Sequence, residues 1–177
     1  MTLTAVEQSA PPLTLQRARL FSGLYVNELL VRLLPLQESC PEIFRQYRTV
    51  LLQLRSDDNV EPALRLFELH LLQELGYGID LHNEWRTGIP IDPAHWYLFQ
   101  AEQGFERLVE PGQRRHELPV FSGADLLAIA ESRLDEASAA RSAKRLVRLA
   151  LAGHLGDKPL RSRGLFRRRV PGHQDEA

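Results

Sequence analysis

The stretch L-R-L-F-E-L-H-L-L-Q-E-L-G-Y-G-I-D-L, residues 64–81, predicts a helix with an abrupt end. Its leucines and phenylalanine recur at intervals of three and four residues, so they share one face of a helix. Gly76 follows the last of them, at a position where helices commonly end in a left-handed residue. Glu68 interrupts the apolar face, where a carboxylate is costly unless it is paired. We therefore predict a structural ion pair, with Arg65 or a cation on another helix, that holds helices in register.

Helical patterns on both sides of this stretch predict a mainly α protein, built as a helical bundle. Residues 20–34 are apolar around most of the helix circumference, which is typical of a helix in the middle of a bundle. Prolines and glycines elsewhere fall where helices open or end, and Ser122 with Asp125 fits a capping box. Further helices are expected at about 41–54, 62–75, 126–134 and 137–155, with a last short one from Ser162.

Residues 79–121 have a different character and predict a small irregular insert. Seven prolines and glycines interrupt this segment, which has little helical periodicity. H-W-Y-L-F-Q at 95–100 and G-F-E-R-L-V at 104–109 are separated by three residues, which predicts a β-hairpin. The expected organisation is a disordered arm at 1–16, a helical domain at 17–169 that carries the insert, and a flexible tail at 170–177.

Composition bounds the class of protein. The 177 residues are 44% apolar and 25% charged, as in ordinary soluble globular domains. The single cysteine, Cys40, excludes a disulfide within the chain and a zinc cluster built from cysteines. The N-terminus lacks the basic and apolar regions of a secretory signal, and no apolar run approaches the roughly 20 residues that span a bilayer. These features favour a protein of the cytoplasm.

The residue types that usually carry catalysis form no recognisable pattern. The chain has no phosphate-binding glycine loop, no G-x-S-x-G and no H-E-x-x-H. Cys40 has no activating neighbour in the sequence, which argues against a nucleophile. His82 and Glu84 could share a metal ion, but two residues on a surface loop are the simpler explanation. We therefore expect a binding protein with no catalytic residue, no metal ligand and no cofactor.

Charge is distributed unevenly along the chain. Residues 1–140 carry 12 Lys or Arg and 20 Asp or Glu, whereas residues 141–169 carry ten Lys or Arg and one acid. Four of these cations lie on one side of a helix, where like charges repel each other. Acids of the body could balance them as a solvated face, but we favour contact with the phosphates of a polyanion, without sequence reading. The predicted DNA-binding residues are Arg141, Lys144, Arg145, Arg148, Lys158, Arg161 and Arg163.

Glu28 is a second acid on a strongly apolar helix. Arg32 follows it at i+4, and an acid that precedes a base at this spacing is the favourable orientation for an ion pair. Because nothing around Glu28 suggests a paired acid and base, we predict a structural ion pair, with Arg32 or with a cation from another helix.

Four segments together resemble bacterial RecO, the recombination mediator. They are F-S-G-L-Y-V-N-E-L-L-V-R-L-L, E-P-A-L-R-L-F-E-L-H-L-L-Q-E-L-G-Y-G, S-A-K-R-L-V-R-L-A-L and L-G-D-K-P-L-R-S-R-G-L-F-R. Their order and spacing agree with the family from about Leu20 to Phe166, and G-Y-G and K-P-L-x-S-R-x-L-F are the most distinctive pieces. The resemblance implies that the helix quoted first, with its glycine, introduces the family's small irregular subdomain.

The resemblance implies a non-enzymatic function in DNA repair by the RecF pathway. RecO proteins bind DNA, single-strand binding protein and RecR, and they help to anneal strands or to load RecA. Their helical part receives the acidic C-terminal tail of single-strand binding protein, which ends in a phenylalanine with a free carboxylate. Such a tail needs an apolar pocket rimmed by Arg or Lys. Arg65 matches the position expected to contact the tail, and Arg114 and Arg115 lie near a second one. The alternative for Arg65 is an ion pair with Glu61 or Glu68.

Two departures from the family pattern limit what the resemblance implies. RecO proteins begin with an OB-fold barrel that binds single strands, whereas nothing before Leu20 reads as five strands. Many relatives carry four cysteines after G-Y-G that bind zinc, and here that segment has none, so we expect no zinc. One alternative function is therefore an interaction module that has lost DNA binding together with the barrel. A second, from another class, is a hydrolase that uses His82 and Glu84.

Overall fold

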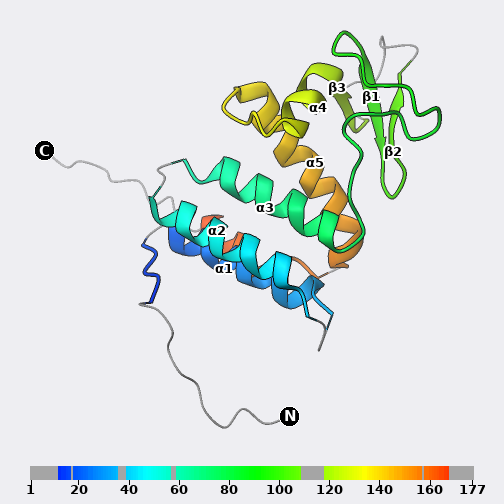
Figure 1. The fold of residues 1–177 in the computed structure, drawn as a ribbon. Helices are drawn as coiled ribbons and strands as arrows, with labels where there is room; N and C mark the ends of the chain where they lie inside the picture. The colour runs from blue at the N-terminus through cyan, green and yellow to red at the C-terminus, as the bar shows by residue number, and fades with distance from the viewer. Residues whose placement is uncertain are drawn as a thin grey trace, which may run out of the picture.

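The computed structural model describes residues 12–16, 18–35, 39–56, 59–108, 118–156 and 158–167. Within these ranges the fold is mainly helical, with one small open sheet (Figure 1). No helix in them is both long and apolar enough to cross a membrane. The elements are α1 (Ala18–Leu33), α2 (Pro41–Ser56), α3 (Glu61–Glu74), β1 (Trp96–Gln100), β2 (Gly104–Arg107), β3 (Val120–Ser122), α4 (Gly123–Ala130), α5 (Ala137–Leu155) and α6 (Arg161–Arg167).

Helix α5 joins two apolar cores. Its second half places Val147 and Leu151 in a cluster with side chains of α1, α2 and α3. Its first half places Ala143 and Leu146 in a second cluster with the sheet and α4. All four side chains are fully buried, and each large one contributes about 1.5–3 kcal/mol of transfer free energy. In Figure 1 the helix accordingly runs from the sheet to the layer of α1, α2 and α3.

The insert is a three-stranded antiparallel sheet in the order β2-β1-β3. The predicted hairpin is confirmed, with Tyr97 opposite Arg107 and Gln100 opposite Gly104. Strand β3 was not expected, because its three residues are too few to show an alternating pattern. The rings of Phe99, Phe105 and Phe121 pack against one another on the buried face, two of the three pairs edge to face.

Two predicted helix ends, one marked by a glycine and one by a serine, are confirmed. Gly76 has a φ of +82°, and the amide of Tyr77 donates to the carbonyl of Leu72 at 2.8 Å, which closes the end of α3. Ser122 accepts a hydrogen bond from the amide of Asp125 at 3.1 Å and so caps α4.

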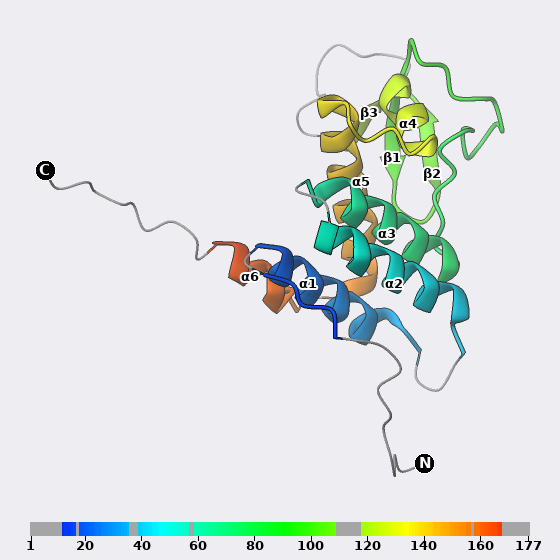
Figure 2. The same cartoon turned by 60° about the vertical axis from the view of Figure 1, so that its left-hand side comes forward.

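Helix α1 lies at the edge of the bundle, and the prediction that it occupies the middle was wrong. Figure 2 shows it beside α6 and α2 on the side away from the sheet. Leu20, Leu24 and Val31 are 44%, 41% and 84% exposed, so its apolar residues do not all reach a core. The helix is apolar on nearly every side, but within the described ranges only one side is covered, mainly by α2, α5 and α6.

Candidate functional site

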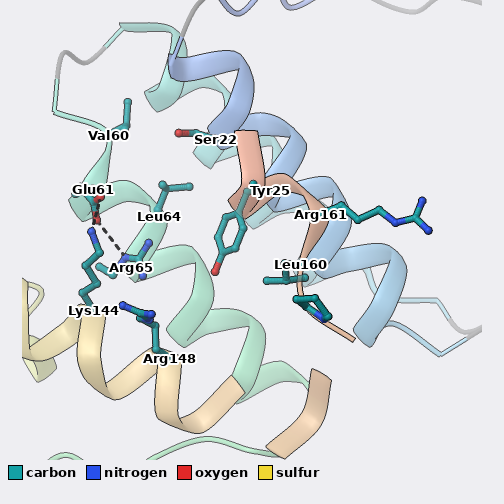
Figure 3. A pocket seen from close by; sticks show the side chains of 12 residues that line it. Ser22, Tyr25, Val60, Glu61, Leu64, Arg65, Lys144, Arg148, Leu160 and Arg161 are labelled. Carbon is teal, nitrogen blue, oxygen red and sulfur yellow. Dashed lines mark hydrogen bonds and ion pairs between the residues drawn. The ribbon is translucent and has the colours of Figure 1, made fainter. Parts of the chain in front are cut away.

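A pocket of about 750 Å³ lies where α1, α3, α5 and α6 meet (Figure 3). Tyr25 of α1 and Leu64 of α3 belong to the buried core and turn their remaining surface to the pocket. The segment before α6 closes another side with Pro159 and Leu160. Its apolar lining consists of Tyr25, Val60, Leu64, Pro159 and Leu160.

Cations surround this apolar surface. Lys144 and Arg148 rise from α5 beside Arg65 of α3, whereas the Arg161 side chain extends away from them (Figure 3). From the sequence, Arg65 is predicted to bind a peptide and the other three cations to bind DNA. The fold brings all four to one pocket, because α3 and α5 pack side by side. An apolar surface with cations at its rim suits a ligand that is apolar at one end and anionic beside it.

A buried charge network fixes the guanidinium of Arg65. Its Nη1 lies 2.9 Å from Oε2 of Glu68, whose side chain is fully buried. The hydroxyl of Tyr25 donates to the other carboxylate oxygen, so the network joins α3 to α1. The predicted structural ion pair of Glu68 with Arg65 is confirmed. The pair holds a buried cation in place at the pocket wall, where the side chain of Arg65 remains 8% exposed.

Glu61 is the one acid among the residues that line the pocket. Its Oε1 lies 3.0 Å from Nζ of Lys144, and its Oε2 lies 3.7 Å from Nε of Arg65. It occupies the first turn of α3, where an acid is favourable against the helix dipole. The ion pair of Glu61 with Arg65, one of the two alternatives expected from the sequence, therefore forms together with the Glu68 pair.

Helix α1 fastens α6 through Glu28. The carboxylate accepts hydrogen bonds from the amides of Arg161 and Ser162 and from the Ser162 hydroxyl, at 2.8, 2.9 and 2.6 Å. Burial raises the pKa of Glu28, but these hydrogen bonds and the charge of Arg32 outweigh it, so the pKa lies below its ordinary value. Glu28 is structural, but the ion pair predicted for it does not form within the described residues, and its carboxylate binds two amides and a hydroxyl instead.

Arg32, one turn further along α1, fastens the connection between α5 and α6. Its guanidinium donates to the carbonyl of Lys158 at 2.7 Å and to the carbonyl of Leu155. Together with Glu28 it holds the K-P-L-R-S segment, residues 158–162, against α1. This segment supplies Pro159 and Leu160 to the pocket, so the most distinctive sequence motif of the chain is a wall of the site.

The other predicted DNA-binding residues have different surroundings. Arg141 and Arg148 are exposed and form no ion pair with any residue that the structure describes. They line, with Lys144, Arg145 and Leu149, a second hollow along α5. Arg145 also donates to the carbonyls of Val120 and Leu118 at 3.0 and 2.6 Å. Lys158 is exposed, whereas the side chain of Arg163 and both Arg114 and Arg115 lie outside the described residues.

The candidates for metal binding and catalysis stand apart from this pocket. Glu84 is buried and accepts a hydrogen bond from the hydroxyl of Thr87 at 2.9 Å, which ties down its own loop. Cys40 is partly buried before α2. In the part of the chain that the structure describes, no three His, Cys, Asp or Glu side chains are grouped to hold a metal ion.

Sequence reasoning missed the residues that complete the pocket. Tyr25, Glu61 and Leu160 come from three distant segments, and nothing in their local pattern shows that they meet. The one available signal was Tyr25 itself. A tyrosine on a strongly apolar helix is expected to be buried, and its hydroxyl then needs a hydrogen-bond partner from another segment.

Comparison with known proteins identifies relatives along nearly the whole chain. The family described as Recombination protein O C terminal matches residues 15–164. DNA repair protein RecO of Haemophilus influenzae (strain 86-028NP) is 42% identical over 170 residues, which cover 96% of this chain and 70% of that protein. DNA repair protein RecO of Pseudomonas putida (strain W619) is 47% identical over 152 residues, 85% of this chain and 63% of that protein. The chain belongs to the RecO family.

Proposed function

We propose that this protein is a non-enzymatic recombination mediator in DNA repair, and that its pocket receives the acidic C-terminal tail of single-strand binding protein. RecO proteins are recombination mediators rather than enzymes. The observation that carries the specific proposal is the apolar surface of Tyr25, Leu64 and Leu160 beneath the cations Arg65, Lys144 and Arg148. The proposed partners are single-strand binding protein, RecR and DNA, with the protein in the bacterial cytoplasm at the nucleoid.

The chemistry of the tail suits this pocket at two points. A terminal phenylalanine side chain would leave water for the apolar surface, which is favourable in proportion to the area that it buries. The free carboxylate would then lie at the rim, where Arg and Lys donate charge-assisted hydrogen bonds. Arg65 is already held by Glu68, so little side-chain entropy is lost when it binds the ligand.

A peptide titration tests the tail pocket. A fluorescently labelled acidic peptide that ends in phenylalanine is titrated with the protein, and its anisotropy gives Kd. Arg148→Ala removes one rim cation and should raise Kd about tenfold, the value of one charge-assisted hydrogen bond. Arg48→Ala, which removes an exposed arginine on α2 outside the pocket, is the matched control and should leave Kd unchanged. Equal Kd values for Arg148→Ala and the wild type would contradict the proposal.

The basic hollow along α5 is the proposed contact for DNA phosphates. Arg141 and Arg148 support this because both are exposed and form no ion pair within the described residues. Arg145 is expected to contribute less, since its guanidinium already binds two carbonyls. Binding of single-stranded DNA should weaken steeply as salt concentration rises. If the protein fails to bind single-stranded DNA at low salt, the alternative of an interaction-only module is correct.

A further inference from the structure

Glu61 lies where the carboxylate of a pocket ligand would bind. Its two oxygens face two different cations of the rim, Lys144 at 3.0 Å and the Nε of Arg65 at 3.7 Å (Figure 3). Each of these cations also lines the pocket. A carboxylate that bridges two cations at the mouth of an apolar pocket reproduces the charge arrangement of a bound peptide terminus.

The two contacts of Glu61 are weaker than those of the buried network of Arg65 and Glu68. The side chains of Glu61 and Lys144 are 47% and 49% exposed, and ion pairs at such exposed positions are weak. Arg65 already has Glu68 as its close partner through Nη1. Its Nε is buried and makes no hydrogen bond with the described residues, because 3.7 Å is too long for one. A buried donor beside the pocket thus lacks an acceptor among the described residues.

We propose that Glu61 is an internal competitor for the site of the ligand carboxylate. This inference rests on the proposed function, since it concerns the same pocket and the same acidic peptide. The free C-terminal carboxylate of the ligand displaces Glu61 and takes its place between the ammonium of Lys144 and the Nε–H of Arg65. Displacement costs little because the Glu61–Lys144 pair is exposed. Glu61 therefore lowers the affinity of the pocket for ligands that end in a carboxylate.

The test replaces Glu61 with its neutral isostere. Glu61→Gln should lower the Kd of the acidic peptide that ends in phenylalanine about two- to fivefold, the range expected from one exposed ion pair. The same peptide with a C-terminal amide should gain much less, because it brings no terminal carboxylate to the vacated position. Circular dichroism and a thermal melt of each variant establish that the helical fold is retained.

The control variant removes an acidic side chain that lies outside the pocket. Glu42→Gln removes an acid that is ion-paired with Arg45 at the start of α2, outside the pocket, and should leave both affinities unchanged. An equal gain for the acid and the amide would show general charge repulsion and overturn the inference. Unchanged or weaker binding by Glu61→Gln would also overturn it. If the wild type binds the acid peptide normally, these results leave the proposed function intact; a wild type that binds neither peptide contradicts both.

Discussion

The two edges of the basic stripe on α5, one toward the sheet and one toward the pocket, carry the same residue types and use them differently. On the side of the sheet, Arg145 donates to two carbonyls near β3 and lies 5.2 Å from the ring centre of Phe121. On the side of the pocket, Arg148 is exposed and forms no ion pair with a described residue, and Lys144 shares only the exposed carboxylate of Glu61. The first cation holds the insert against the helix, whereas the other two are open to a ligand.

This difference shows what a basic stripe in a sequence can mean. The stripe predicts that cations lie along a helix, but the neighbouring backbone decides which of them are consumed by the fold. An arginine bound to carbonyls contributes to the stability of the fold and little to ligand binding. An arginine without such partners contributes little to stability and remains able to bind a ligand. Arg65 combines both properties, since it is bound to Glu68 and also lines the pocket.

The largest effect is expected from the buried network. Glu68→Ala leaves the charge of Arg65 buried without its close partner, which typically costs about 3–5 kcal/mol. Tyr25→Phe removes only the hydroxyl donor and should cost less, about 1.5–3 kcal/mol for a hydrogen bond to a charged group. Urea unfolding followed by circular dichroism measures both. A Glu68→Ala protein as stable as the wild type would contradict the claim that the buried charge of Arg65 depends on Glu68.

The next effect isolates Arg145, at the edge of the basic stripe toward the sheet. Arg145→Ala removes two hydrogen bonds to carbonyls and should lower the free energy of unfolding by about 1.5–3 kcal/mol. Peptide affinity should change less than twofold, because Arg145 does not line the pocket. The same urea experiment with a peptide titration separates the two quantities. Normal stability with a large loss of peptide affinity would contradict the structural role assigned to Arg145.

A smaller effect is expected for DNA binding at the basic hollow along α5. Arg141→Ala should reduce the slope of log K against log salt concentration for single-stranded DNA by about 1, the value of one phosphate contact. Peptide affinity and stability should stay unchanged, since Arg141 is exposed and outside the pocket. Filter binding at several salt concentrations gives the slope. An unaltered slope would remove Arg141 from the DNA surface.

The smallest effect concerns pH and Glu28. Because its pKa is lower in the folded protein than in the unfolded chain, Glu28 stabilises the fold above the usual glutamate pKa of about 4.3. This contribution is lost as pH falls through the folded-state pKa. The difference in unfolding free energy between wild type and Glu28→Gln should therefore be largest at neutral pH and shrink below pH about 4. A difference that is independent of pH would contradict the assigned role.

Local signals explain how much of the fold could be predicted. Pro41 opens α2, Gly76 ends α3 with a positive φ and Gly156 ends α5, each because the requirement lies in the residue itself. The hairpin was also predictable from a local signal, because its two strand patterns are separated by only three residues. The buried pair of Arg65 and Glu68 is also local, since the two residues are three apart on one helix.

Contacts between distant segments explain what could not be predicted. Glu28 binds Ser162 across 134 residues, and Lys144 pairs with Glu61 across 83. The exposure of α1 depends on which elements cover it, and its own pattern is compatible with any position. The pocket itself was expected only from the family resemblance, because its lining comes from four helices that the sequence does not bring together.

The most direct test of the pocket is to map the peptide on the protein. Backbone amide chemical shifts of the ¹⁵N-labelled protein are followed while the acidic peptide that ends in phenylalanine is added. The largest saturable shifts should fall at the first turn of α3, at Lys144 and Arg148, and at Leu160 and Arg161. Shifts concentrated in the insert at residues 79–107, with the pocket amides unmoved, would contradict a ligand site between α1, α3, α5 and α6.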